Sequence, residues 1–254
     1  MRFASLGSGS RGNSLIVDAG DTRLLIDCGF SPRSATSRLA RLSIDPEEIS
    51  GILVTHEHAD HAAGVFRFAA RFGTPVYMTH GTHAGVRRED GLSADCRLID
   101  GQGKFSVRGL EVTPFPVPHD AREPVQFVLS DGARRLGVLT DCGTVTPHLT
   151  TMLEGCQALV LECNHDPGLL AASVYPARLK RRIAGGFGHL ANREAASLLR
   201  RIGAAGLRHV VAAHLSERNN RPELARAALA RALDCEEDWI GVAAQEAGIG
   251  WREI

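Results

Sequence analysis

The run Thr55-His56-Glu57-His58-Ala59-Asp60-His61 decides the fold and the chemistry of this chain of 254 residues. It comes directly after a short apolar segment, residues 51–55, that predicts a strand. Neutral imidazoles and a carboxylate are ligands that zinc, manganese and iron accept. The H-x-H spacing on an extended segment points two imidazoles the same way, because alternate side chains of a strand share a face. The last two residues, Asp60 and His61, then turn into a helix and can face a second ion.

The segments around this motif predict short strands and helices. Residues 14–18 and 24–27 flank a turn at Gly20-Asp21 and predict a hairpin. Ser31-Pro32 has the pattern of an N-cap followed by the first helical residue, and this helix would run to about Leu42. After the motif, the apolar spacing predicts a helix over residues 61–72 and then a strand over residues 75–78.

The middle of the chain is rich in predicted strands and the last third in predicted helices. Further strands are predicted at residues 104–107, 110–117, 125–129, 135–140, 158–162 and 208–213. Further helices are predicted at residues 176–184, 192–202 and 222–233. The end of the chain, residues 239–243 and 249–252, predicts a closing hairpin. Two halves with strands first and helices after favour a layered α/β sandwich over a regular β-α alternation, and we expect one domain over residues 1–254.

Composition narrows the class of protein. Hydrophobic residues make up 44% of the chain and charged residues 23%, which is typical of a soluble globular protein. The formal net charge of +0 excludes a long-range attraction to nucleic acid or anionic membrane, although a local basic patch is compatible with it. None of the six cysteines forms a C-x-x-C pair, so neither a zinc ribbon nor a thioredoxin motif is indicated. With no signal-peptide pattern and no apolar run of the ~20 residues that span a bilayer, we expect a cytoplasmic protein without membrane contact.

The histidine motif resembles that of the metallo-β-lactamase superfamily, and the resemblance covers nearly the whole chain. In that superfamily H-x-H-x-D-H is followed in order by an isolated His, an Asp and a His, each at a strand end. This chain supplies His119, Asp141 and His214 in that order after predicted strands. Any one of the three alone is more often a structural or surface residue, whereas their order and placement together favour metal ligands. Histidines without such a placement are expected to be structural or exposed: His80, His83, His148 and His209.

The resemblance implies a four-layer αββα sandwich of the α/β class with two divalent metal ions per chain. Zinc or manganese are the expected metals, with iron as a further candidate. One ion would be held by His56, His58 and His119, and the other by Asp60, His61 and His214. Asp141 would bridge the two. Asp27, in the run Leu24-Leu25-Ile26-Asp27-Cys28-Gly29, matches a position expected to hydrogen-bond the metal loop without binding metal.

Finer motifs resemble the YycJ (WalJ) branch of the superfamily, whose relatives include RNase Z and RNase J. The N-terminal run Leu6-Gly7-Ser8-Gly9-Ser10-Arg11-Gly12-Asn13-Ser14 carries this likeness. So do the runs Leu161-Glu162-Cys163-Asn164-His165-Asp166 and Gly188-His189-Leu190-Ala191-Asn192. The branch more often has serine where this chain has Cys163 and Ala191. Proteins of this branch are described as DNA exonucleases that degrade duplex from the 5′ end, so the resemblance implies DNA as the partner and substrate.

Two segments are compatible with a nucleic-acid substrate. The glycine-rich N-terminal loop carries Ser8, Ser10 and Asn13, and such a loop can offer N–H groups to a phosphate or form an ordinary turn. A basic cluster lies on a predicted helix, and it is either a solvated helix face or a grip on a nucleic-acid backbone. The cluster consists of Arg178, Lys180, Arg181 and Arg182, with Arg193, Arg200 and Arg201 further on.

The expected reaction is phosphodiester hydrolysis. Two ions would lower the pKa of a bound water to near 7, giving a hydroxide, and would offset charge on the phosphate oxygens. Asp60 would act in catalysis through the metal. In RNase Z a glutamate and a histidine after the bridging aspartate protonate the leaving group, and Glu162 and His189 occupy matching places in order. His189 would be the general acid oriented by Glu162, or else a helix cap or a phosphate contact, and His165 is a second candidate for phosphate contact.

Other functions of this fold stay open at the level of sequence. A glyoxalase-type thioesterase uses the same metal core, whereas lactam hydrolysis calls for neither a basic helix nor a Glu/His pair. A non-catalytic metal-binding or redox module is a different class. Flavodiiron proteins of this kind place a carboxylate in the motif and fuse a flavodoxin domain, and His58 argues against them. The chain has no room for the large inserted domain of RNase J and no evident tRNA-binding arm, which favours a general nuclease or phosphodiesterase.

Overall fold

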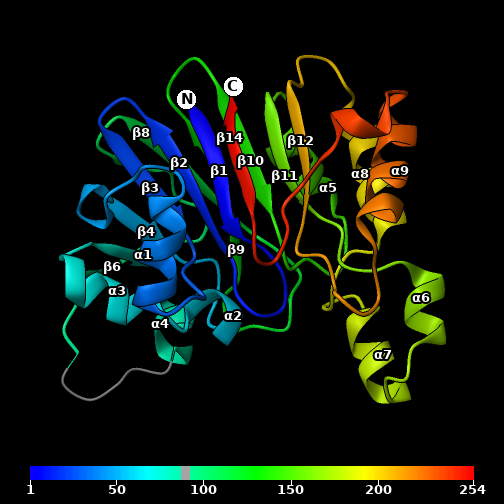
Figure 1. Ribbon diagram of the computed structural model, residues 1–254, viewed down its shortest axis with the longest axis horizontal. Coiled ribbons are helices and arrows are strands. Elements are labelled where there is room, and N and C mark those ends of the chain that lie inside the picture. The colour runs from blue at the N-terminus through cyan, green and yellow to red at the C-terminus, as the bar shows by residue number, and fades with distance from the viewer. Residues whose placement is uncertain (87–91) are drawn as a thin grey trace.

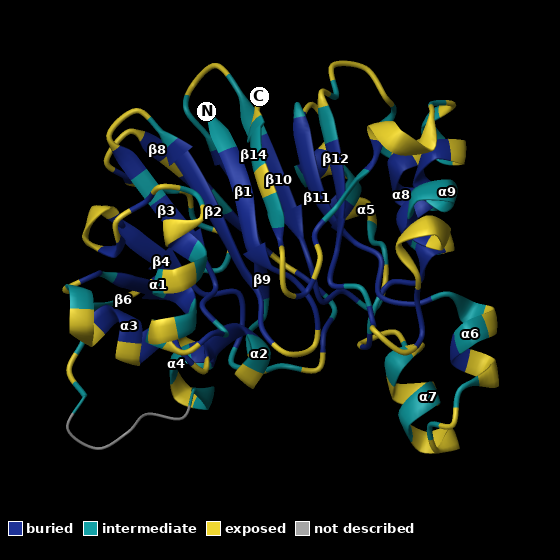
Figure 2. Cartoon of the chain, in the orientation of Figure 1, coloured by how far each residue is buried: buried dark blue, intermediate teal, exposed yellow. Residues whose placement is uncertain are grey.

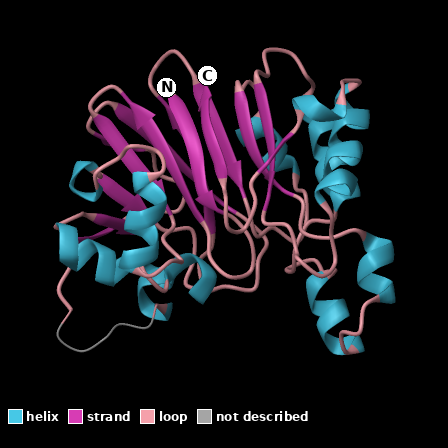
Figure 3. Ribbon diagram, in the orientation of Figure 1, coloured by secondary structure: helices cyan, strands magenta, loops and turns pink. Residues whose placement is uncertain are grey.

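Two β-sheets packed face to face form the centre of the protein in the computed structural model, which describes residues 1–86 and 92–254 (Figures 1 and 3). The first sheet contains, in spatial order, β14 (Ile249–Glu253), β1 (Arg2–Gly7), β2 (Ser14–Ala19), β3 (Thr22–Ile26), β4 (Gly51–Leu53), β5 (Val76–Met78) and β6 (Cys96–Leu98). The second contains β13 (Gly241–Val242), β12 (His209–Ala213), β11 (Ala158–Glu162), β10 (Arg135–Leu139), β9 (Val125–Ser130), β8 (Leu110–Pro116) and β7 (Phe105–Val107).

Helices lie on the outer faces of the sheets and around one end of the sandwich. The α-helices are α1 (Pro32–Ala40), α2 (Ala59–Ala62), α3 (Val65–Phe72), α4 (His80–Gly85), α5 (Pro147–Leu153), α6 (Pro167–Ala172), α7 (Ala177–Ile183), α8 (Asn192–Ile202) and α9 (Pro222–Leu233). Two short 3₁₀ helices are η1 (Pro46–Glu48) and η2 (Glu237–Trp239). None of the helices described is long and apolar enough to cross a membrane.

Apolar side chains from both sheets fill the space between them. Phe3 and Leu53 of the first sheet lie in one buried cluster with Phe127 and Val138 of the second. Alternate residues of a strand face opposite sides, so the other residues of each strand face the outer layers. Figure 2 shows that the central strands are mostly buried, whereas the edge strand β14, the helices and the loops carry exposed residues. Full burial of a side chain of this size contributes roughly 1.5–3 kcal/mol.

Each sheet is covered on its outside by its own helices. Leu39 of α1 and Phe68 of α3 pack on the first sheet. Leu149 of α5, Leu199 of α8 and Leu229 of α9 pack on the second. The helix start predicted at Ser31-Pro32 is confirmed, since Ser31 Oγ accepts a hydrogen bond from the Ser34 N–H. Helix, sheet, sheet and helix give the four layers of an αββα sandwich, which confirms the predicted fold class.

The helix predicted over residues 61–72 is wrong as one element. The structure has two helices there, α2 and α3, separated at Gly64. The Gly64 N–H donates to the carbonyl of Cys28, 2.9 Å away, so this residue is tied to the neighbouring strand end. A Cβ at Gly64 would lie 1.7 Å from the carbonyl oxygen of Phe30. The close approach of two backbones therefore breaks the helix, and only glycine permits it.

The closing hairpin predicted at the end of the chain is also wrong. β13 pairs parallel with β12 in the second sheet, whereas β14 pairs antiparallel with β1 in the first. A single bridge between Ala244 and Gly248 joins the two segments. The last turn of the chain therefore crosses from one sheet to the other, because an isolated two-stranded ribbon is only marginally stable whereas each strand here extends a larger sheet. Short elements that the sequence did not predict are β1, β6, α5 and α6.

Candidate metal centre

The predicted ligands come together because the strands before them end at the same edge of the sandwich. β3 and β4 are parallel neighbours, and β10, β11 and β12 are parallel to one another. The carboxyl ends of parallel strands meet at one edge, which is where ligand sites of α/β sheets lie. His56 follows β4, Asp141 follows β10 and His214 follows β12. In Figure 1 the helices α2, α6 and α7 lie at this same end of the molecule.

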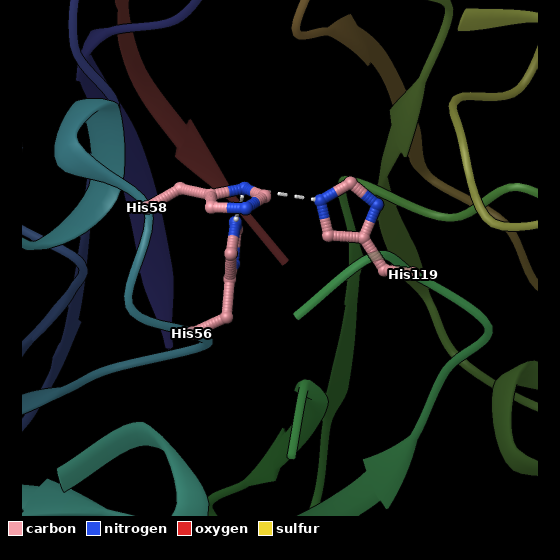
Figure 4. A group of neighbouring side chains, drawn as sticks. All are labelled: His56, His58 and His119. Carbon is pink, nitrogen blue, oxygen red and sulfur yellow. Dashed lines mark hydrogen bonds between the residues drawn. The ribbon is translucent and has the colours of Figure 1, made fainter. Parts of the chain in front are cut away.

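Three imidazoles converge on one point of this edge (Figure 4). His56 Nε2 lies 3.0 Å from His58 Nδ1, and His119 Nε2 lies 3.3 Å from the same His58 atom. His56 and His58 come from the first sheet's loop, while His119 follows β8 of the second sheet. Three nitrogens that face one another at such distances form a donor set for a divalent cation.

A second group of ligand atoms lies beside the first. His214 Nε2 is 3.3 Å from Asp60 Oδ2, and His61 Nε2 is 3.5 Å from the same oxygen. Asp60 and His61 belong to α2, whereas His214 lies at the end of β12. One carboxylate oxygen and two imidazole nitrogens again suit a divalent cation.

Asp141 lies between the two groups. Its Oδ2 is 2.8 Å from His61 Nε2, and its Oδ1 is 3.6 Å from His214 Nε2 and 3.9 Å from His119 Nε2. Oδ2 is buried and, although His61 Nε2 lies this close, makes no hydrogen bond of good geometry among the described residues. A buried carboxylate oxygen without a hydrogen bond needs a positive partner, so the residues present fit metal ions at this place.

The charges of the cluster fit the same interpretation. Burial by itself raises the pKa of Asp141, but the imidazoles of His214 and His61 outweigh it and hold this pKa well below its usual range. Burial opposes protonation of His214, yet Asp141 and its neighbours raise the pKa of His214 to about 9. Burial and the nearby His61 together lower the pKa of His56. Protonated imidazoles therefore supply part of the positive charge that metal ions would otherwise provide. Metal binding must release these protons.

Each ligand imidazole except His58 is fixed through its other ring nitrogen. His56 Nδ1 lies 2.9 Å from Thr55 Oγ1, and His119 Nδ1 lies 3.0 Å from the carbonyl oxygen of Gly188. His61 Nδ1 lies 2.7 Å from Asp27 Oδ2. Such outer partners set the tautomer and direction of a metal-binding histidine. Asn164, which the sequence did not single out, has Nδ2 3.3 Å from His214 Nδ1, and its position directly after β11 is the signal that could have indicated it.

Three residues of the site have left-handed backbone conformations that only glycine adopts freely. The φ angles are 61° at Asp27, 49° at Asp141 and 54° at His214. Each residue comes just after a strand, where the chain turns sharply and aims the side chain across the sheet edge. Strained backbone of this kind costs of order 1–3 kcal/mol and concentrates at functional sites.

Asp27 holds the histidine motif in place through hydrogen bonds to Thr55 and a close contact with His61. Its Oδ1 accepts the Thr55 N–H at 2.8 Å, and its Oδ2 accepts the Thr55 hydroxyl at 2.9 Å and lies beside His61 Nδ1. The carboxylate is buried, and both residues that it contacts, Thr55 and His61, belong to the histidine motif. Asp27 thus fixes the direction of His61 without facing the other ligand atoms.

We expect Asp27→Asn to weaken metal binding by about 10–100-fold, because loss of an outer partner of a metal-binding histidine has effects of this size. Asparagine tolerates the left-handed backbone, so the substitution tests the charge and not the turn. Competition with a chromogenic chelator measures the affinity. Asp18→Asn is the matched control, since Asp18 is a buried carboxylate that pairs with Arg2 away from the site. Equal metal affinity in the Asp27 variant and the wild type would refute the role.

Glu162 and His189 form a pair against Asp141. His189 Nδ1 lies 2.8 Å from Glu162 Oε1 and 3.2 Å from Asp141 Oδ1. Glu162 is fully buried at the last position of β11, and its other oxygen accepts the N–H groups of Cys142 and Leu190. Burial opposes protonation of His189, but the two carboxylates outweigh it and raise the pKa of His189 to about 11. The imidazole therefore carries a proton at neutral pH beside the metal centre.

The loop between β1 and β2 contacts two of the predicted ligands, His214 and His61, through buried side chains. Ser8 Oγ accepts the N–H of His214 at 2.8 Å and donates to Asn13 Oδ1 at 3.2 Å. Asn13 Nδ2 lies 3.1 Å from His61 Nε2 and donates to the carbonyl oxygen of Gly9. Both side chains are buried and these hydrogen bonds lie within the protein, so substrate binding by these two residues stays a prediction. Ser10 is the exposed member of the predicted trio.

His165 and the basic helix α7 lie beside His189, where they line a pocket separate from the predicted metal ligands. His165 is buried, and Lys180 and Arg181 of α7 line the same pocket as His165 and His189. Arg182 instead pairs with Asp120 at 2.6 Å. The structure therefore divides the basic cluster, because successive residues of a short helix face different directions.

The four remaining histidines take no part in these groups. His80 and His148 are exposed, and His83 is half-buried in α4. His209 Nε2 lies 2.8 Å from the carbonyl oxygen of Glu253, which joins β12 to the other sheet. All four lie outside the groups of ligand atoms found among the described residues.

This fold, with clustered imidazoles and carboxylates at its sheet edge, defines a metal-dependent hydrolase. The model of the beta-lactamase superfamily domain matches residues 22–215. The chain belongs to the metallo-β-lactamase superfamily, in the branch of YycJ and WalJ, as its motifs indicated.

Two curated relatives match nearly the whole chain. Exodeoxyribonuclease YycJ of Bacillus anthracis is 35% identical over 244 residues, which cover 95% of this chain and 92% of that protein. Exodeoxyribonuclease WalJ of Streptococcus pneumoniae is 31% identical over 245 residues, which cover 95% of this chain and 91% of that one.

Solved structures share the fold at low sequence identity. The metallo-beta-lactamase fold protein YhfI from Bacillus subtilis has a TM-score of 0.77 at 15% identity, with 99% of both chains covered. The short form of human tRNase Z has a TM-score of 0.69 at 15% identity and covers 100% of this chain and 99% of that one. At this identity the likeness shows the fold alone.

Proposed function

We propose that this chain is a DNA exonuclease of 5′-to-3′ polarity that works with two divalent ions, zinc or manganese. The names of the two relatives that align over more than nine-tenths of their length support DNA as the substrate. The observation that carries the proposal is the pair of buried Glu162 and partly exposed His189 beside Asp141, because hydrolysis of a phosphodiester with an alkoxide leaving group needs a proton donor.

Two donor sets support two ions. His56, His58 and His119 would hold one ion, and Asp60, His61 and His214 the other, with Asp141 shared between them. When bound, divalent ions supply Lewis acidity that lowers the pKa of water and offsets the charge of phosphate oxygens. The chain contributes the fixed direction of each ligand, through Asp27, Thr55 and the Gly188 carbonyl.

His189 would give its proton to the oxygen that leaves. Its Nδ1 is engaged with Glu162 and Asp141, so the opposite edge of the ring is the one that can donate. The raised pKa of about 11 comes from two carboxylates, and a cation at Asp141 offsets one of them and brings the pKa back toward neutrality. A donor with a pKa near the working pH is the most effective general acid.

An activity panel tests the proposed function. The metal-loaded chain, with zinc or with manganese, is assayed on 5′-phosphorylated duplex DNA, RNA, bis-p-nitrophenyl phosphate, a glutathione thioester and a cephalosporin. We expect the duplex DNA to be cleaved at least about tenfold faster than the thioester or the lactam, because only the phosphodiester uses both the ions and the proton donor. An Asp141→Asn protein purified in parallel reports contaminating nuclease. Faster turnover of the thioester or the cephalosporin than of any phosphodiester would contradict the proposal.

A further inference from the structure

A pocket outside the metal centre opens beside His189. It has a volume of about 480 Å³ and is bounded by α6, α7 and the start of α8. Its walls are mainly apolar, with Pro167, Leu170 and Ala191 among the residues that line it. Two helices of these walls, α6 and α7, project beyond the sheets in Figure 1. The volume lies in the range of pockets that hold one small organic ligand.

His165 lines this pocket and has one ring nitrogen without a hydrogen-bond partner among the described residues. Only 3% of the residue is exposed, and its Nδ1 has no hydrogen-bond partner among the described residues. Buried polar atoms are nearly always paired, so an unpaired one beside a pocket indicates a missing partner. The backbone holds the residue firmly, because the Asn192 N–H donates to the His165 carbonyl and His165 pairs with Ala191 in a β-bridge.

Positive charge surrounds the mouth of the pocket. Lys180 is fixed there by its hydrogen bond to the carbonyl oxygen of Ala171, and Arg181 is exposed next to it. Arg193 also lines the pocket, but Glu194 neutralises it at 2.7 Å. Helix α8 begins at the pocket without a side chain that caps it, since its N-cap is Ala191. Glu194 in the first turn of α8 offsets the partial positive charge of this helix N-terminus, so Lys180 and Arg181 carry the positive charge of the pocket.

We propose that this pocket binds the nucleotide that leaves during cleavage. The phosphate of that nucleotide lies against His165, Lys180 and Arg181, and its base lies on the apolar wall. The inference rests on the proposed function, because His189 borders both the metal centre and the pocket and protonates the departing oxygen. In that step water releases one proton to solvent and its oxygen bonds to the scissile phosphorus. The bond from phosphorus to the sugar oxygen breaks, and the sugar oxygen takes the proton of His189.

Binding of deoxyadenosine monophosphate to the metal-loaded full chain tests this site by calorimetry. Inorganic phosphate and deoxyadenosine are measured beside it. We expect the monophosphate to bind at least about tenfold more tightly than either fragment, because only it engages both the cations and the apolar wall. Equal affinities for the monophosphate and inorganic phosphate would show that the apolar wall does not bind the base, and this result would overturn the proposal.

Three substitutions locate the ligand. Arg181→Ala and His165→Gln should each weaken binding of the monophosphate by about tenfold. Ala171→Trp, at an exposed position of the pocket lining, should weaken the monophosphate but not inorganic phosphate, because the indole occupies the place of the base. Arg178→Ala is the matched control on the same helix, since Arg178 is exposed and lies outside the pocket lining. Unchanged binding in Arg181→Ala, an exposed position that does not endanger the fold, overturns the proposal.

The two proposals fail separately. In one outcome the wild-type chain degrades DNA, while Arg181→Ala and His165→Gln leave KM and the affinity for the monophosphate unchanged. This outcome supports the proposed function and contradicts the proposed pocket. If the wild-type chain is inactive on every phosphodiester, the proposed function is contradicted. The role of the pocket in binding the leaving nucleotide is then contradicted too, even if the monophosphate binds. Tenfold weaker binding in both variants, together with a raised KM for 5′-phosphorylated duplex and an unchanged KM for bis-p-nitrophenyl phosphate, supports both.

Discussion

Asp141→Asn is expected to reduce bound metal from about two ions per chain to fewer than one and to slow hydrolysis by roughly 10³-fold or more. Among the residues that the structure describes, Asp141 is the one carboxylate that lies within 4 Å of predicted ligand nitrogens from both groups. An amide of the same shape keeps the packing but removes the charge that both ions would share. Metal ions contribute several kcal/mol to the transition state, and each 1.36 kcal/mol is tenfold in rate.

Elemental analysis of the purified variant gives the metal content, and the rate is measured on duplex DNA at saturating metal. Asp234→Asn is the matched control, because Asp234 has nearly the same left-handed φ of 53° and is exposed at the end of α9. It should keep full metal content and rate. Asparagine tolerates this backbone conformation, so a misfolded Asp141→Asn protein is not the expected outcome. Two ions per chain and a normal rate in that variant would remove Asp141 from the ligand set.

His189→Ala is expected to lower kcat on DNA by about 10²–10⁴-fold, the usual contribution of general acid catalysis. The same variant should lose much less on bis-p-nitrophenyl phosphate, whose leaving group departs without a proton. Metal content should stay unchanged, because His189 Nδ1 is held by Glu162 and Asp141 and the residue is no proposed ligand. The difference between the two substrates separates proton donation from phosphate binding, which would weaken both alike.

Two companion variants sharpen this experiment. Glu162→Gln removes the charge that orients His189 and should reproduce part of the loss on DNA while sparing the p-nitrophenyl substrate. His148→Ala, an exposed histidine of α5, should change neither rate. Equal losses on both substrates in His189→Ala would exclude the general acid role. A fall in bound metal would make His189 a ligand, as the proximity of its Nδ1 to Asp141 permits.

The sequence alone determined the strand ends and the ligand types. His56, His58, Asp60 and His61 follow one another within a single turn of chain, so local backbone geometry suffices to bring them near a common point. Alternating apolar residues predicted the strand before His119, and a continuous apolar run predicted the strand before His214, which is buried on both faces. Local signals also gave the start of α1, where the Ser31 cap and Pro32 act within one helical turn.

Only the tertiary structure decided which of the distant residues meet. Asp141 and His61 are separated by 80 positions of sequence and by 2.8 Å in space, and no local pattern encodes that distance. The split at Gly64 and the crossing from β13 to β14 likewise depend on neighbours that lie far along the chain.

The same limit explains the polar loop and the pocket. Ser8 and Asn13 have the composition of a phosphate-binding loop, and only the structure shows that Ser8 Oγ accepts the His214 N–H and that Asn13 Nδ2 lies beside His61 Nε2. His165 looks in sequence like any histidine after a strand, and only the structure shows that it lines a pocket among α6, α7 and α8 with its Nδ1 unpaired among the described residues. Sequence specifies which groups a residue can offer, whereas burial and the identity of its neighbours decide which of those groups remain free to bind.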